Sequence, residues 1–175
     1  MKEKILTFDQ LIELFERTDI KIEKLAKQIA EQGKMINGIA ESNGLAAETL
    51  ISNTLENSLS LNGWSFDYAD INVKKHIKGL NIREQFDLVL GKENLLAIVE
   101  IKYRVRTEDV TELANRKIPN YKKLFPNETR HIVGVVAGMS IDDHTIEVAK
   151  ANGIYAITLS GDQIKVENAI YKEFV

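Results

Sequence analysis

The residues of this chain best suited to chemistry are two acids and a lysine on neighbouring apolar segments: Asp87, Glu100 and Lys102. Glu100 follows the apolar run Leu95–Val99, which is typical of a strand buried on both faces. Strand periodicity places Glu100 and Lys102 on one face of that strand. Charges in such a run are costly to bury unless they are paired or bound to a metal.

Asp87 lies in an apolar stretch of its own, separated from the next by a turn at Gly91–Asn94. If the two stretches pair as strands across this turn, Asp87 and Glu100 lie side by side, and their carboxylates repel. A divalent cation removes that conflict, and oxygen ligands of this kind favour Mg²⁺ or Mn²⁺. Lys102 beside them can orient or deprotonate an attacking water and stabilise charge that develops on phosphorus. The pattern predicts a metal-dependent phosphodiesterase.

The same residues resemble the signature of a known family. Asp87, followed by Glu100-Ile101-Lys102 on the next strand, resembles the D…(D/E)-x-K signature of the PD-(D/E)XK nuclease superfamily. Phe86 stands where the signature has proline, as in many members. Glu48, near the start of an expected helix, matches an acidic residue that the family often places there. The resemblance covers the whole chain and is strongest to prokaryotic members that carry an N-terminal coiled coil.

This resemblance implies an α/β, restriction-endonuclease-like core of helix, three strands, helix and strand, with a mixed sheet flanked by helices. It also implies that Asp87, Glu100 and the carbonyl of Ile101 hold the metal. Lys102 would serve the water as a catalytic residue, and Glu48 would assist.

The first forty residues carry an apolar repeat of alternating three- and four-residue steps. Its a and d positions are apolar except for Thr18 and Gln32, the apolar ones being Phe8, Leu11, Phe15, Ile22, Leu25, Ile29, Ile36 and Ile39. These positions form a narrow apolar seam along one side of the helix, and such a seam is buried only against a partner helix. We therefore predict a long coiled-coil oligomerisation helix over residues 1–42, most simply in a homodimer, and a nuclease-like domain over 43–175.

Turn and capping residues divide the rest of the chain. We expect the first helix to end at Asn43-Gly44, with a further break near Thr18-Asp19, and a second helix over 45–61. Alternation then predicts strands at 64–68, 71–73, 85–90, 95–103 and 131–137, and a hairpin over 154–166. Helical segments are expected at 108–124 and after Ser140–Asp143, which resembles a capping box.

Composition narrows the function classes. The chain has no cysteine, no apolar run long enough for a bilayer and no secretory signal at its start, so we expect a cytoplasmic protein without membrane contact. A formal net charge of −3 argues against coating nucleic acid by bulk charge. Two basic stretches nevertheless flank the candidate strands, and we expect phosphate contacts from these residues: Lys74, Lys75, Lys78, Arg104 and Arg106. The alternative for each stretch is ordinary solvated surface.

Two other functions remain open for such a fold. One is a catalytically inactive nucleic-acid-binding or protein-scaffold module, because related folds often lose catalysis and keep binding. The complete set Glu48, Asp87, Glu100 and Lys102 favours the enzyme, acting on DNA. The other is a coiled coil that docks the domain onto a different protein.

Overall fold

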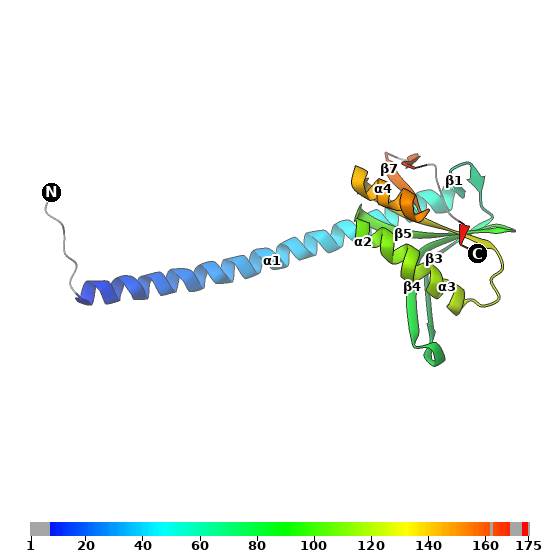
Figure 1. Ribbon diagram of the computed structural model, residues 1–175. Coiled ribbons are helices and arrows are strands. Elements are labelled where there is room, and N and C mark those ends of the chain that lie inside the picture. The colour runs from blue at the N-terminus through cyan, green and yellow to red at the C-terminus, as the bar shows by residue number, and fades with distance from the viewer. Residues whose placement is uncertain (1–7, 162, 169–172, 175) are drawn as a thin grey trace. The chain divides into compact units, whose positions relative to one another are not determined.

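A single long helix opens the protein. The computed structural model describes residues 8–161, 163–168 and 173–174, and the chain divides into two units between Ser42 and Asn43. Helix α1 spans Phe8–Ser58 (Figure 1), so the expected break at Asn43-Gly44 is wrong. A glycine inside a helix costs about 1 kcal/mol relative to alanine. The helix-favouring residues after it and the buried anchors Ile51 and Leu55 outweigh that cost.

The expected break near Thr18-Asp19 is absent as well. The Thr18 hydroxyl donates to the carbonyl of Leu14 at 2.7 Å, inside the continuous helix. Such a bond to the preceding turn lets threonine remain in a helix interior.

The second unit is built on a mixed sheet whose described strands follow the order β3-β4-β5-β6-β7-β8, with β9 beside β6. Their bounds are β3 Tyr68–Ile77, β4 Ile82–Gly91, β5 Leu95–Val105, β6 His131–Ile141, β7 Tyr155–Ser160, β8 Gln163–Val166 and β9 Glu173–Phe174. The neighbours β5, β6 and β7 run parallel, and the other pairs are antiparallel. A small hairpin of β1 Ser60–Leu61 and β2 Trp64–Ser65 precedes the sheet, and η1, Lys78–Leu80, closes the β3–β4 hairpin.

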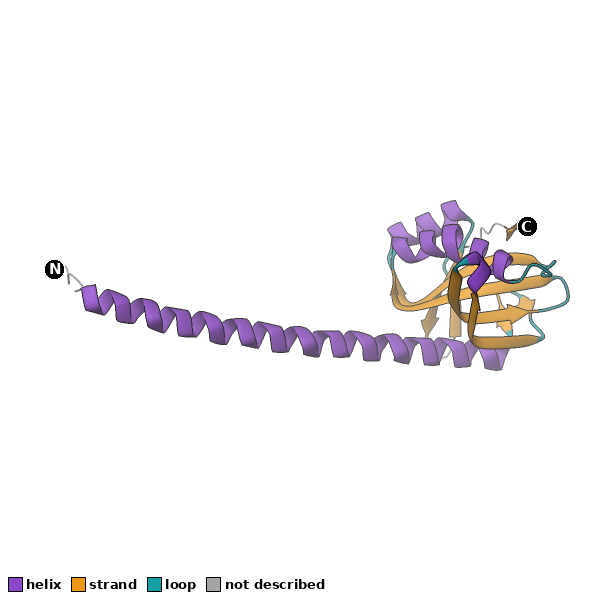
Figure 2. Ribbon diagram, turned by 90° about the horizontal axis from the view of Figure 1, so that it is seen from below, coloured by secondary structure: helices purple, strands orange, loops and turns teal. Residues whose placement is uncertain are grey.

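Helices cover both faces of this sheet. One face carries α2 Thr107–Glu112, the π-helical turn η2 Leu113–Lys117, α3 Ile118–Leu124 and α4 Asp143–Asn152. Figures 1 and 2 show these helices on one side of the strands, and the last turns of α1 lie on the other. The predicted α/β fold, with a helix-flanked mixed sheet behind a long N-terminal helix, is therefore confirmed. The helix expected over 108–124 is present, but a π-helical turn divides it.

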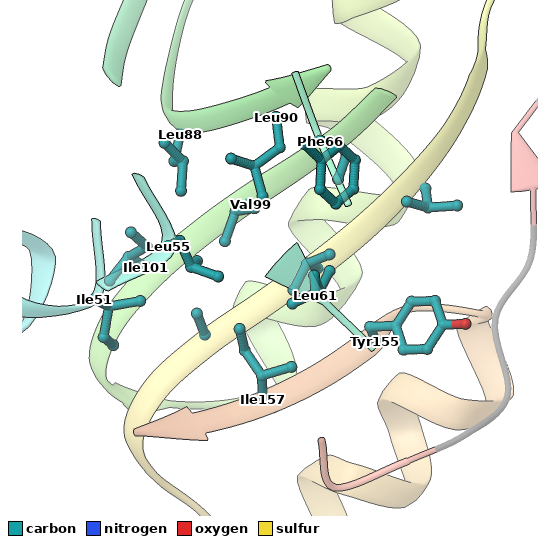
Figure 3. Close-up of a cluster of buried hydrophobic side chains, with 14 of the residues drawn as sticks. Ile51, Leu55, Leu61, Phe66, Leu88, Leu90, Val99, Ile101, Tyr155 and Ile157 are labelled. Atoms are coloured by element: carbon teal, nitrogen blue, oxygen red, sulfur yellow. The ribbon is translucent and has the colours of Figure 1, made fainter. Parts of the chain in front are cut away.

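Each face of the sheet buries its own apolar core. The core under α1 contains Ile51, Leu55 and alternate residues of β5 such as Val99 and Ile101 (Figure 3). The opposite core contains Leu96 and Ile98 from the same strand, packed against α2, α3 and α4. Strand β5 is thus buried on both faces, as its continuous apolar run predicts.

The predicted cap at Ser140 needs correction. Strand β6 runs on to Ile141, so Ser140 lies in the strand and does not cap a helix. The cap of α4 is Asp142, whose side chain accepts a hydrogen bond from the Thr145 backbone N–H at 2.9 Å. An aspartate side chain directly before the first helical residue can accept from a free backbone N–H as well as a serine can.

Candidate functional site

Strands β4 and β5 separate at the point where the candidate residues lie. Their backbone pairing runs from Gly91 opposite Leu96 to Leu88 opposite Val99 and stops there. Beyond that level β4 stays paired with β3, and β5 stays paired with β6. We call the opening between residues 82–87 of β4 and 100–105 of β5 the fork. Because Asp87 and Glu100 follow the last paired residues, both lie at its apex.

A change of direction in β4 places Asp87 there. Phe86 packs into the core under α2–α4, whereas Leu88 packs into the core under α1. Residues two apart in a regular strand face the same side, so the strand turns over at Asp87. The neighbouring strand turns at the same level, where Asn72 has a φ of 56° and its side chain accepts from the Gln85 amide at 2.9 Å. Asparagine tolerates this left-handed conformation better than most residues.

The fork is held by side chains where backbone pairing has ended. The Asp87 carboxylate accepts the backbone N–H of Ile101 at 2.8 Å. One oxygen of Glu100 accepts from the Lys102 ammonium at 2.6 Å, and the other accepts from Lys117. Lys117 also donates to the backbone carbonyl of Gln85 at 3.0 Å, so its ammonium joins the two sides of the fork.

The charges of the fork balance within the chain. Asp87, Glu100 and Lys117 are all buried, while Lys102 is partly exposed. Two carboxylates thus face two ammonium groups at one point in the sheet. Such a cluster can be buried because each charge has a partner of opposite sign.

Burial, followed by the nearby Glu100 carboxylate, raises the pKa of Asp87 to about 6. Burial also works against the charge on Lys102, but the Glu100 carboxylate outweighs it and raises the pKa of that ammonium. Lys102 is therefore a firmly protonated cation in the resting fork. It suits the stabilisation of negative charge on a phosphate better than the removal of a proton from water.

The donor set of the fork suits a hard divalent cation in chemical type. Asp87 and Glu100 supply carboxylate oxygens, and Ile101 supplies a backbone carbonyl between Glu100 and Lys102. A cation would have to replace a lysine at Glu100, whose two oxygens are both engaged. Within the part of the chain that the structure describes, no three acidic or histidine side chains form a group that could hold a metal. The half-buried Glu48 therefore does not join this pair, and its assisting role stays a prediction.

Comparisons with known proteins add a weak likeness in fold. No family model and no curated protein matches the chain. It is similar to the small subunit of the heterodimeric restriction endonuclease R.BspD6I, with 15% identity, a TM-score of 0.39, and 65% of this chain and 62% of that chain covered. It is also similar to protein VC1899 from Vibrio cholerae, with 16% identity, a TM-score of 0.40, and coverages of 64% and 28%. This chain thus matches less than two thirds of the length of either protein.

The five basic residues predicted to meet phosphate lie in two separate places. Lys74 and Lys75 line a hollow of about 430 Å³ on the β3–β4 hairpin. Lys78 begins the turn that joins the two strands of this hairpin. Arg104 and Arg106 line another hollow, of about 350 Å³, beside the starts of α2 and α4. Phosphate contact by either group stays a prediction.

Lys117 is the residue of the fork that the sequence analysis missed. A signal for it exists in the helical spacing, since buried residues precede and follow it by one turn, at Leu113 and Tyr121. A lysine on the apolar face of a helix is unusual unless its charge is paired inside the protein. Its partner could not be named from the sequence, because the π-helical turn ending at Lys117 sets the direction of its side chain.

Proposed function

We propose that this chain is a metal-dependent phosphodiesterase acting on DNA, with the PD-(D/E)XK-like site at the fork. The observation that carries the proposal is the buried pair of Asp87 and Glu100 with Lys102 on the same strand. Buried acids with a raised pKa beside a lysine are typical of a functional site. A cytoplasmic location remains part of the proposal.

The residues would divide the work as follows. Mg²⁺ or Mn²⁺, held by Asp87, Glu100 and the carbonyl of Ile101, would supply Lewis-acid activation of the phosphate and of a water. Asp87, bonded to the Ile101 N–H, fixes the backbone that presents this carbonyl. Lys102 would place its positive charge next to the phosphoryl oxygens, where negative charge grows in the transition state. Lys117 would keep the Glu100 carboxylate oriented through the ion pair with one of its oxygens.

A second candidate function, the catalytically inactive nucleic-acid-binding or scaffold module, is favoured by one observation. Both oxygens of Glu100 are already neutralised by lysines, and Glu48 does not complete a third acidic ligand. In that case the fork would be a structural ion cluster. The two candidates differ in whether a divalent cation can displace a lysine.

The chain would act as a homodimer joined by the N-terminal half of α1. The seam residues of that segment whose side chains are described are each more than half exposed: Phe8, Phe15, Ile22, Leu25, Ile29, Ile36 and Ile39. The side chain of Leu11 lies outside the described residues. Exposing an apolar seam of this length to water is unfavourable, and a partner helix would bury it. Docking onto a different protein is the alternative, and co-purification of a second chain in equal amount would favour it.

Thermal melting with and without Mg²⁺ or Mn²⁺, together with plasmid nicking, tests the proposed site. The cation should raise the melting temperature of the wild type, because it binds the folded state alone. Asp87→Asn should abolish that rise. The Lys102→Ala variant should keep the metal-induced rise in melting temperature. Its nicking rate should be lower by about 10²-fold or more, the usual effect of removing a group that stabilises transition-state charge.

Lys117→Met separates the two candidates. If the fork binds metal, removing the competing ammonium should increase the stabilisation that Mn²⁺ gives. Arg116→Met is the matched control, because Arg116 bonds Glu84 and Glu112 and neither fork carboxylate. A wild type that does not respond to either cation, with a Lys117→Met variant that melts earlier and is not rescued, would leave the inactive module as the function.

A further inference from the structure

On the β4 side of the fork, β3 and β4 continue as a two-stranded ribbon. We call residues 72–87, with the η1 turn between the strands, the arm. Its strands pair with each other from Val73 opposite Phe86 to Ile77 opposite Ile82, and β5 pairs with neither over this stretch. Figure 1 shows this hairpin running out past the rest of the sheet.

One face of the arm is fixed to the helices. The Lys75 ammonium lies over the ring of Phe125, 4.1 Å from its centroid. Its cross-strand partner Glu84 is buried and accepts from Arg116 and from the Asn120 amide. These contacts keep the ribbon in place, and they occupy both the lysine and the acid.

The opposite face of the arm is exposed and carries only cationic or neutral polar side chains. It consists of two cross-strand pairs, Lys74 with Gln85 and His76 with Arg83. These four residues, together with Lys75 and Glu84, line the hollow of about 430 Å³. Glu84 is the only acid between Ile71 and Gln85, and it belongs to the other face. The Glu84 carboxylate at this hollow is engaged by Arg116 and Asn120, so the exposed face presents net positive charge.

We infer that this face is a duplex-binding ribbon that enters the major groove of DNA, an inference that rests on the proposed function and names its substrate class. The major groove of B-DNA is roughly 12 Å wide and 8.5 Å deep and admits a two-stranded β-ribbon. Strands lie about 4.8 Å apart and rise about 3.3 Å per residue, so the five residues Val73–Ile77 extend roughly 15 Å. The arm is thus narrow enough to enter the groove and long enough to reach its floor.

The same geometry selects DNA over RNA. The major groove of an A-form RNA duplex is deep and too narrow for side chains to read. A single strand has no groove to receive a ribbon. The arm should therefore prefer duplex DNA to an RNA duplex of the same sequence and to single-stranded DNA.

The arm also leads directly to the fork. Gln85 contributes its side chain to the exposed face, and its backbone carbonyl accepts from Lys117. Only Phe86 separates Gln85 from Asp87 in the chain. DNA held along Lys74 and Arg83 would have its backbone close to the Asp87–Glu100 pair.

Fluorescence anisotropy with a short labelled DNA duplex, in EDTA so that no cleavage occurs, tests the inference. The variant is Lys74→Ala/Arg83→Ala. Its matched control is Lys123→Ala/Lys150→Ala, which removes the same charge from exposed positions on α3 and α4. If two phosphate contacts are lost, the slope of log affinity against log salt should fall by about 2 for the arm variant. The control should keep the wild-type slope, and thermal melting verifies that both variants fold.

Competition with an RNA duplex and with single-stranded DNA completes the experiment. The wild type should prefer the DNA duplex, and the arm variant should lose that preference. Equal affinities for the arm variant and the control, an RNA preference, or a wild type that does not bind duplex DNA would each overturn the inference. Binding through the arm without nicking in Mg²⁺ would leave the arm standing and remove the nuclease proposal. Nicking that is unaffected by Lys74→Ala/Arg83→Ala would remove the proposed role of the arm and leave the nuclease proposal standing.

Discussion

Ionisation of Asp87 is costly in the fork, because burial and then the Glu100 carboxylate raise its pKa from 3.8 to about 6. Between these two values the folded protein holds a proton that the unfolded chain has released. Stability should therefore fall as pH rises from about 4 through 6, and the full cost should be present above pH 6.

Asp87→Asn removes this titration while keeping the size of the side chain. In metal-free buffer the variant should gain stability over the wild type as pH rises from 4 to 6, by no more than roughly 3 kcal/mol at neutral pH. Urea unfolding of both proteins across this range measures the difference. Asp70→Asn, at an exposed position of β3, is the control and should follow the wild-type profile. Parallel profiles for Asp87→Asn and the wild type would mean that Asp87 is not destabilised by its surroundings.

At the residue scale the sequence identifies the centre of the site but not its surroundings. Asp87, Glu100 and Lys102 can be selected because charge interrupts apolar strands, and the structure places all three at the fork. The partners of these residues depend on packing. Lys117 ends the π-helical turn η2, and its ammonium contacts both Gln85 of β4 and Glu100 of β5. The same limit applies to Lys75, whose ring contact with Phe125 links segments that lie fifty residues apart.

At the scale of elements, hydrophobic periodicity predicts which segments are helices and strands, and turn chemistry predicts their ends less well. The buried strands β4, β5 and β6 follow from their apolar runs. Asn43-Gly44 does not end a helix, because the buried residues after it keep the chain helical. Ser140 resembles a cap in the sequence, yet pairing of Arg104 with Ser140 extends β5 and β6 and moves the helix start on to Asp142.

This difference can be measured at the start of α4. Asp142→Ala should lower the melting temperature by a few degrees, because the Thr145 N–H loses its acceptor. Ser140→Ala should leave the melting temperature close to that of the wild type, since Ser140 is an exposed strand residue. The reverse order of effects in a melting experiment would restore Ser140 as the cap.

At the scale of the whole molecule, α1 sets how copies of the chain can meet. No helix in the described parts of the chain is both long enough and apolar enough to cross a bilayer. The exposed apolar seam of α1 calls for a partner helix. Three of its a positions are isoleucine, at Ile22, Ile29 and Ile36. In parallel coiled coils, β-branched residues at a with leucine at d favour two strands.

The polar positions of the seam favour parallel pairing in register. Thr18 and Gln32 both occupy d positions, so a parallel pair places each opposite its own copy, where two amides or two hydroxyls can bond each other. In an antiparallel pair an a residue faces a d residue. Gln32 would then lie against Phe15 at full overlap, and a buried amide without a partner is costly.

A cysteine substitution distinguishes the two arrangements, because the natural chain contains no cysteine. In a parallel pair in register, Ile36→Cys brings the two new thiols within bonding range, and oxidation should give a covalent dimer on a non-reducing gel. An antiparallel pair at full overlap would place position 36 opposite Leu11 and prevent the bond. Lys34→Cys, on the outer side of the helix, is the control and should stay uncrosslinked. A dimer by light scattering that Ile36→Cys fails to crosslink would make the pair antiparallel, and a monomer would end the proposal of self-association.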